Sequence, residues 1–192
     1  PAGIGPEIIL KALADPNLRR ALRPLVVGDP HVMQRTAELL NLDVQIKALP
    51  PLQNDADLKA VAQEPDDENT LPVLQGSRQE AKDVPLGKVD PRAGRAAYDY
   101  IATAVRLTMG GVTRAIVTAP VNKAALAAAG VTHAGHTEIL AELTGTRDYS
   151  MLLSGRTLRI AHVSTHISLR AACDAVRRDR VATVARLLHQ TL

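Results

Sequence analysis

Helical and extended segments alternate along the first 49 residues, and this alternation limits the fold more than any other feature of the sequence. Pro6 suits the first turn of a helix, and apolar residues keep helical spacing after it to about Ala14. The apolar run at 25–27 ends in a Gly-Asp-Pro turn and is typical of a buried strand. A helix over 32–40 and a strand over 44–49 repeat the pattern. The sequence therefore predicts an α/β fold with a mostly parallel sheet and flanking helices.

Residues 50–90 interrupt this alternation. The stretch holds several prolines and an acidic run, and only Val73 with Leu74 favours a short strand. It is too long for a plain loop in a compact domain. We therefore predict three parts, which are an N-terminal α/β portion over 1–49, an irregular crossover over 50–90 and a second α/β portion over 91–192.

The second portion returns to the alternating pattern. We expect a long helix over 91–109, a buried strand over 114–119 and two helices over 122–129 and 135–143. A pair of strands is expected at 150–153 and 158–163, followed by two helices over 169–176 and 179–192. Gly110 and Gly111 favour the end of the long helix, and Asn122 can cap the helix that follows the strand. The α/β pattern therefore extends over this portion as well.

The composition narrows the classes of function. The chain has no Phe or Trp and only three Tyr, so its core is built from Leu, Ile, Val and Ala. This argues against single-strand nucleic-acid binders, which stack bases on aromatic side chains, and against immunoglobulin-like sandwiches. The 23 Lys and Arg are interspersed with 20 Asp and Glu, without a basic face or a DNA-binding motif. We therefore expect no nucleic-acid partner.

The single cysteine, Cys173, excludes an internal disulfide and a cysteine-based zinc site. We interpret it as a small buried apolar residue on a helix, and a reduced, cytoplasmic location is the simplest setting. No apolar run reaches the roughly 18 residues that a membrane helix needs, and no segment resembles a signal peptide. We therefore expect no membrane partner. Because no strand precedes the glycine-rich opening, we also expect a partial chain.

A Gly-His-Thr-Glu motif at 135–138 opens a predicted helix. The free N–H groups and the dipole at a helix start can hold an anion such as phosphate or carboxylate. In the alternative interpretation, Thr137 or His136 serves only to cap the helix. The motif therefore makes His136 and Thr137 candidate ligand-binding residues.

Two further motifs follow predicted strands, where parallel sheets present residues to ligands. His166 is placed to act as a metal ligand or a general base, unless Ser164 or Ser168 satisfies it in a partly buried position. Lys123 could contact phosphate, although a lysine at a helix start is usually only solvated. The Gly-Ile-Gly sequence at 3–5 resembles half of a phosphate loop, but its spacing fits neither common nucleotide-binding motif.

Together these motifs occur in an order that resembles the 4-hydroxythreonine-4-phosphate dehydrogenase (PdxA) family. They are Pro-Ala-Gly-Ile-Gly-Pro-Glu at 1–7, Thr-Ala-Pro-Val-Asn-Lys at 118–123, Gly-His-Thr-Glu at 135–138 and Ser-Thr-His at 164–166. The resemblance runs through the whole chain and is weakest over 50–90. It implies a fold similar to isocitrate and isopropylmalate dehydrogenases, and a homodimer with its active site at the interface.

The resemblance also implies a reaction and its residues. The secondary alcohol of a 4-phosphorylated hydroxy acid would be oxidised by NAD or NADP to a β-keto acid that loses carbon dioxide. His136 and Thr137 would contact the substrate. His166 would be one of three histidines that hold a divalent metal, which would be zinc, magnesium or cobalt. The other metal and substrate residues of the family lie in a later segment, so the chain resembles the N-terminal part of a longer enzyme.

Three functions remain open on these residues. The first is oxidation of 4-hydroxythreonine 4-phosphate in pyridoxal phosphate biosynthesis. The second belongs to a sister group that shares the motifs, the 4-phospho-D-threonate and 4-phospho-D-erythronate dehydrogenases of sugar-acid catabolism. The third is a non-catalytic module that only binds an anion at the helix start near Gly135.

Overall fold

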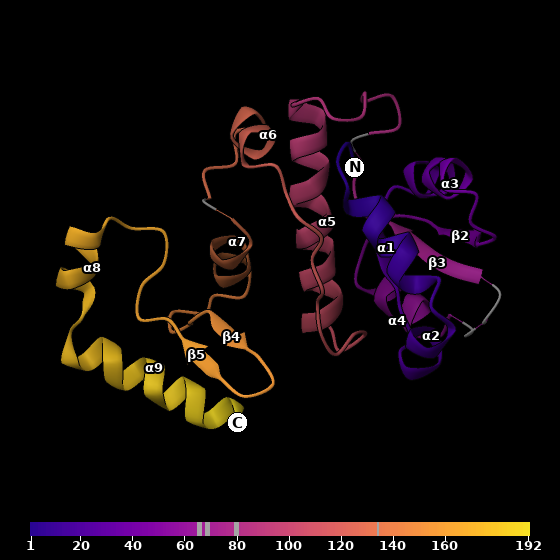
Figure 1. Cartoon of the computed structure of the whole chain (residues 1–192). Helices are drawn as coiled ribbons and strands as arrows, with labels where there is room; N and C mark the ends of the chain where they lie inside the picture. The colour runs from indigo at the N-terminus through magenta and orange to yellow at the C-terminus, as the bar shows by residue number, and fades with distance from the viewer. Residues whose placement is uncertain (65–66, 68–69, 79–80, 134) are drawn as a thin grey trace. The chain divides into compact units, whose positions relative to one another are not determined.

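The computed structural model describes residues 1–64, 67, 70–78, 81–133 and 135–192. Contacts between residues divide the chain into two units, Pro1–Leu140 and Ala141–Leu192. The first unit contains a three-stranded parallel sheet with helices, and the second contains a two-stranded antiparallel pair with helices (Figure 1).

The sheet of the first unit has the strand order β1-β3-β2, and all neighbouring strands are parallel. Its strands are β1 (Val26–Gly28), β2 (Gln45–Leu49) and β3 (Thr70–Gln75). Val73 of the central strand pairs with Val26 on one side and with Ala48 on the other. The predicted parallel sheet is therefore confirmed, together with its predicted strands at 25–27 and 44–49.

Prolines and acidic residues mark the starts of several helices in this unit. The helices are α1 (Gly5–Leu13), α2 (Pro16–Ala21), α3 (Pro30–Leu39), α4 (Ala56–Ala62), α5 (Pro91–Met109), α6 (Lys123–Ala128) and α7 (His136–Leu143), which runs into the second unit. The carboxylates of Asp15, Asp29 and Asp90 accept hydrogen bonds from N–H groups in the first turns of α2, α3 and α5. These groups would otherwise lack a partner, so the three aspartates fix where these helices begin.

Helices cover both faces of the sheet, because successive side chains of β3 point to opposite faces. Leu71 and Val73 join a core cluster with Leu10 of α1 and with residues of α3. Leu74 joins a different cluster with Leu107 of α5, against which α4 also packs. Leu10, Leu71, Val73 and Leu74 are completely buried, so this sheet and its helices form the main core of the unit.

The stretch 50–90 contains more regular structure than the sequence predicts. The strand expected at Val73 and Leu74 is confirmed, but it is six residues long and is the central strand of the sheet. Helix α4 was not predicted. Pro72 hides the strand in the sequence, because proline lacks the N–H group that a central strand normally donates. The division into parts 1–49, 50–90 and 91–192 stays a prediction.

The buried strand predicted over 114–119 is wrong. These residues form neither helix nor strand, and Val117 is 96% exposed. A strand needs a neighbouring strand to accept and donate its backbone hydrogen bonds. No described strand pairs with this segment, so its apolar residues remain uncovered despite a sequence pattern typical of a buried strand.

The close contact between α5 and α6 depends on one glycine. A methyl group built on Gly94 would lie 1.9 Å from the backbone oxygen of Ala125 and 2.9 Å from the backbone nitrogen of Leu126. Both of these α6 residues are buried. Any side chain larger than hydrogen at position 94 would therefore push the two helices apart.

The second unit contains the predicted pair of antiparallel strands, β4 (Leu152–Ser154) and β5 (Arg159–Ala161), followed by α8 (Leu169–Ala175) and α9 (Arg178–Thr191). Arg180 of α9 donates hydrogen bonds to the backbone oxygens of Val163 and Tyr149. These bonds hold α9 against the segments that flank the two strands. The predicted strand pair and both predicted helices are confirmed.

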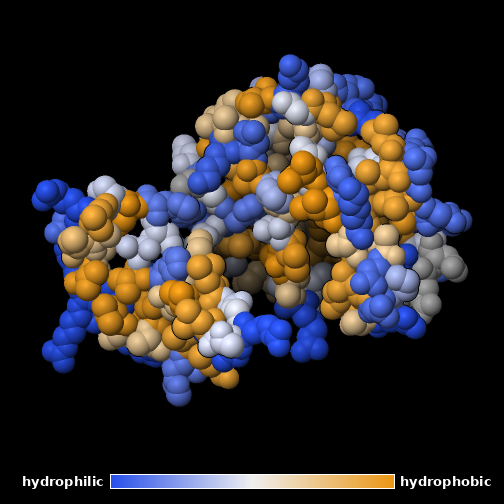
Figure 2. Space-filling model, viewed as in Figure 1, coloured by the Kyte–Doolittle hydropathy of each residue, from blue (hydrophilic) through white to orange (hydrophobic). Residues whose placement is uncertain are grey.

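This unit has very little core of its own. Val184 is its only buried residue, and all of its residues are described. Figure 2 shows apolar side chains gathered on the visible surface over this part of the chain. Its exposed large apolar residues include Leu153, Leu158, Ile160, Ile167, Leu169 and Val176. Cys173 is also exposed, so the prediction that it is buried is wrong, because nothing described covers its face of α8.

Candidate functional site

Three of the predicted motifs lie next to one another in the first unit. A methyl group built on Gly5 would lie 3.2 Å from Cβ of Ala119, so the glycine loop contacts the loop at 118–123. The backbone of Ala119 in turn forms a hydrogen bond with the imidazole of His136. The structure therefore brings together the opening loop, the 118–123 loop and the start of α7.

Local interactions fix the 118–123 loop. The side chain of Asn122 accepts a hydrogen bond of 2.9 Å from the backbone N–H of Ala125, as expected for a helix cap. The next residue, Lys123, is the first of α6. Because Leu126 packs fully buried in the same helix, the position of the loop follows from the packing of α6 on α5.

The start of α7 is anchored by burial and offers unpaired backbone donors. Ile139 is completely buried and its N–H donates to the backbone oxygen of Gly135 at 3.3 Å. The N–H groups of the residues before it have no acceptor one turn earlier within the helix. His136 and Thr137 are half-buried, and neither side chain makes a capping hydrogen bond among the described residues. The capping alternative is therefore not supported by the contacts of these side chains.

Burial sets the charge of His136. Desolvation lowers the pKa of its imidazole below the usual value, and the hydrogen-bonding influence of the Ala119 backbone only partly opposes this shift. The imidazole is therefore neutral at neutral pH. A neutral imidazole has one nitrogen that donates and one that accepts, so His136 can contact a ligand hydroxyl or a ligand oxygen.

Two charged side chains flank Gly135. A methyl group built on this glycine would lie 3.9 Å from Cε of Lys123 and 3.7 Å from a carboxylate oxygen of Glu138. The sequence placed Lys123 and Glu138 in separate motifs and gave no reason to pair them. Only the folded chain brings these two side chains close to the same point.

His166 belongs to the second unit, in the segment between β5 and α8. It is exposed, and its φ of 56° is unusual for a residue other than glycine. Ser168 does not satisfy it, because the Ser168 hydroxyl accepts the N–H of Ala171 and caps α8. His166 is therefore accessible to a ligand.

The described residues do not form a metal site by themselves. Among them, no group of three or more His, Cys, Asp or Glu side chains lies close enough to hold a metal ion. Zinc in proteins takes three or four protein ligands, and His166 supplies one. A metal at this residue would need further ligands from outside this set.

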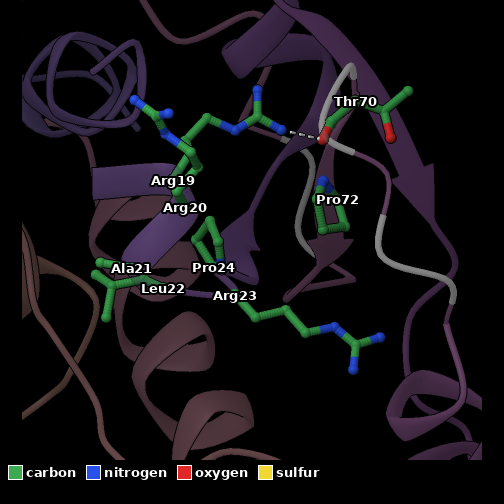
Figure 3. Close-up of a pocket in the computed structure, with 8 residues that line it drawn as sticks. All are labelled: Arg19, Arg20, Ala21, Leu22, Arg23, Pro24, Thr70 and Pro72. Carbon is green, nitrogen blue, oxygen red and sulfur yellow. Dashed lines mark hydrogen bonds between the residues drawn. The ribbon is translucent and has the colours of Figure 1, made fainter. Parts of the chain in front are cut away.

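A cavity of about 270 Å³ lies elsewhere, beside the first residues of β3 and the residues that precede β1. Figure 3 shows that its three arginine side chains point in different directions. Arg19 donates a hydrogen bond of 2.6 Å to the backbone oxygen of Thr70, and Arg20 bonds within α2. Because the guanidinium groups do not converge, and parallel sheets bind ligands at the opposite ends of their strands, we assign no site here.

Comparisons with known proteins agree with these motifs. Residues 20–192 match the family described as pyridoxal phosphate biosynthetic protein PdxA. The chain is 41% identical over 187 residues to a D-threonate 4-phosphate dehydrogenase of Pectobacterium atrosepticum, covering 96% of this chain and 54% of that protein. It is 36% identical over 187 residues to a 4-hydroxythreonine-4-phosphate dehydrogenase of Trichlorobacter lovleyi, covering 97% of this chain and 53% of that protein.

Solved structures give the same result. The fold matches a crystal structure of a 4-hydroxythreonine-4-phosphate dehydrogenase from Burkholderia phymatum with a TM-score of 0.80 and 34% sequence identity. This match covers 96% of the chain and 53% of that structure. The fold and motifs therefore define an α/β chain that is similar to proteins named as dehydrogenases.

More narrowly, the chain belongs to the PdxA family, as the resemblance predicted. It spans about half the length of the curated relatives that it matches. In the part of the chain that is described, no helix is long and apolar enough to cross a membrane.

Proposed function

We propose that this chain is part of an NAD- or NADP-dependent dehydrogenase that oxidises the secondary alcohol of a 4-phosphorylated hydroxy acid, with decarboxylation of the product. The observation that carries the proposal is the convergence of the glycine loop, the 118–123 loop and the start of α7 around His136. The family supports the reaction class, since the relatives named above are dehydrogenases of phosphorylated hydroxy acids.

In this proposal, the chain's own residues bind and orient the substrate. The N–H groups at the start of α7 receive an anionic group, and Thr137 offers a hydroxyl to the same group. The neutral imidazole of His136 donates to or accepts from a substrate oxygen. The nicotinamide supplies the hydride acceptor, while these contacts hold the alcohol carbon in a fixed position.

We further propose that His166 is one ligand of a divalent metal, which would be zinc, magnesium or cobalt. Such a metal, when bound, polarises the substrate alcohol. The remaining ligands would come from the part of the family's length that this chain does not span. A fold similar to isocitrate and isopropylmalate dehydrogenases, a homodimer with its site at the interface and a cytoplasmic location complete the proposal.

The substrate has two candidates. Oxidation of 4-hydroxythreonine 4-phosphate in pyridoxal phosphate biosynthesis fits the description of the family. Oxidation of 4-phospho-D-threonate or 4-phospho-D-erythronate is the second candidate, and the 41% identity to a D-threonate 4-phosphate dehydrogenase favours it. Both candidate substrates would be bound by the same residues of this chain.

The test is reduction of NAD or NADP, followed by absorbance, in the full-length enzyme that carries this chain. The three phosphorylated substrates are compared with a divalent metal present. We expect turnover of at least one, and we expect His136→Ala to raise KM for it by about 10- to 100-fold, the effect of losing a hydrogen bond to a charged group. If phosphorylated substrates bind but none reduces the cofactor, a non-catalytic anion-binding function replaces the dehydrogenase.

A further inference from the structure

His166 has a strained backbone conformation that its own segment does not stabilise. Its φ of 56° lies in the left-handed region, where the Cβ of a residue other than glycine comes too close to the backbone. No hydrogen bond among the described residues involves the segment 164–167. A strained conformation persists only where the surrounding structure imposes it. The position of His166 is therefore set by the two ends of this segment.

One arginine of α9 holds the end that comes from the strand pair. Nε of Arg180 donates a hydrogen bond of 3.0 Å to the backbone oxygen of Val163, and Nη2 donates one of 2.9 Å to that of Tyr149. Val163 follows β5 and Tyr149 precedes β4, so the guanidinium joins the two segments at the open end of the strand pair. Because the donors of a guanidinium form a rigid planar fork, the two bonds fix the direction of the chain as well as its distance.

The packing of α9 fixes Arg180 itself. Val184, the buried residue of this unit, follows Arg180 by one helical turn, so both residues lie on the same face of α9. Arg180 is half-buried on this face, whereas the nearby Arg178 is exposed. The two hydrogen bonds of Arg180 are therefore made from a packed helix and not from a free surface side chain.

A helix cap holds the other end of the segment. The hydroxyl of Ser168 accepts a hydrogen bond of 3.2 Å from the N–H of Ala171, and the backbone oxygen of Ser168 accepts one of 2.8 Å from the N–H of Ala172. Helix α8 therefore begins at a fixed residue. The segment 164–167 joins two anchored points, and the left-handed turn at His166 is part of this connection.

We infer that Arg180 is a positioning residue for His166, and that the affinity of His166 for a divalent metal depends on the bonds from Arg180 to Val163 and Tyr149. The inference rests on the proposed function and deepens it, because it names the residue that orients the proposed metal ligand. Arg180 is not itself a ligand, since a guanidinium has donors and no acceptor. Its effect passes through the backbone between Val163 and His166.

The experiment measures binding of Co²⁺ to the full-length enzyme that carries this chain, after a chelator has removed its metal. Calorimetry gives the Kd, and the visible absorption of the bound ion reports the arrangement of its ligands. Arg180→Met removes both hydrogen bonds and keeps a long unbranched side chain. Arg178→Met is the matched control, because Arg178 lies on the same helix and makes no hydrogen bond or ion pair with a described residue. His166→Ala establishes whether binding depends on His166.

We expect Arg180→Met to raise the Kd for Co²⁺ by about 10-fold and to change the absorption spectrum, as for the loss of a group that orients a metal ligand. Arg178→Met should bind like the unaltered enzyme. All variants are compared at a temperature where circular dichroism shows them to be folded. If Arg180→Met does not fold, Arg180→Lys takes its place, because it keeps the charge but replaces the fork by a single nitrogen. We expect this variant to raise the Kd by less, and an unchanged Kd would contradict the inference.

The outcomes separate this inference from the proposed function. Suppose that His166→Ala weakens binding, while Arg180→Met lowers only Tm and keeps the Kd and the spectrum of the unaltered enzyme. Arg180 then has a purely structural role, and the inference is wrong while the proposed role of His166 stands. If the unaltered enzyme binds no Co²⁺, or if His166→Ala binds it equally well, the proposed metal role of His166 fails and the inference fails with it.

Discussion

Replacing Gly94 by alanine tests the link between packing and the candidate site. A methyl group at this position would stand 1.9 Å from the Ala125 oxygen, whereas ordinary contact begins near 3.4 Å. The shortfall is about 1.5 Å, and the obstructing atoms are backbone atoms of α6 that cannot rotate away. The substitution therefore forces α6 and α5 apart.

The expected loss of stability follows from two opposing effects. Overpacking a dense interior costs about 1–3 kcal/mol, and the rigid obstruction favours the upper part of that range. Alanine in place of glycine within a helix stabilises the folded protein by roughly 0.5–1 kcal/mol, because alanine has the higher helix propensity. We expect a net loss of about 2 kcal/mol, which lowers Tm by roughly 4–8 °C in a chain of this size.

Thermal unfolding followed by circular dichroism measures this loss. Gly3→Ala is the matched control, because no atom lies within 4 Å of its added methyl group, and we expect it to change stability by less than about 0.5 kcal/mol. Since the 118–123 loop moves with α6 and its Ala119 backbone hydrogen-bonds to His136, Gly94→Ala should also weaken binding of 4-phospho-D-threonate. A Gly94→Ala protein as stable as the unaltered protein would refute the close helix contact.

Three further predictions use other parts of the chain. Asp29→Ala should destabilise the protein by about 1–2 kcal/mol in chemical denaturation, and Asp29→Asn by less, because asparagine keeps the cap of α3. Folding lowers the pKa of His136 from its ordinary value of 6.5, so the unfolded chain binds this proton more readily than the folded chain. The contribution of His136 to the free energy of unfolding is therefore fully present above pH 6.5 and is lost as the pH falls below that value. His136→Gln should therefore show a smaller drop in Tm between neutral and mildly acidic pH, and an equal drop would contradict the shift. Exposed Cys173 should react with a thiol reagent in the native protein about as fast as in denaturant, and strong protection would show that its helix face is covered.

The sequence predicts the parts of the fold that local signals determine. The helix at Pro6 has a proline in its first turn, the strand at 25–27 is followed by a Gly-Asp-Pro turn, and the strand at 44–49 alternates apolar and polar residues. The central strand β3 was underestimated because Pro72 argues against a strand locally, while burial between two neighbours favours it. The strand at 114–119 was wrong for the opposite reason, because its local pattern was suitable but no partner strand is present among the described residues.

The candidate site also has one part that the sequence predicts and another part that only the structure shows. The motif order identified His136 and Thr137, which the structure places together at the start of α7. The contact between the glycine loop and Ala119, and the approach of Lys123 to Gly135, join residues distant in sequence. No periodicity or spacing reports such contacts, so only the folded chain shows them.

The strand order β1-β3-β2 has a consequence for synthesis of the protein. The strand that joins the other two is the last of the three to leave the ribosome, and β1 has no other partner in the described sheet. A nascent chain that stops before Thr70 therefore carries two strands with unpaired edges, which are a substrate for chaperones and a hazard for aggregation. Emergence of residues 70–75 completes both strand pairings at once, so a translational pause before this point prolongs the vulnerable state and a pause after it does not.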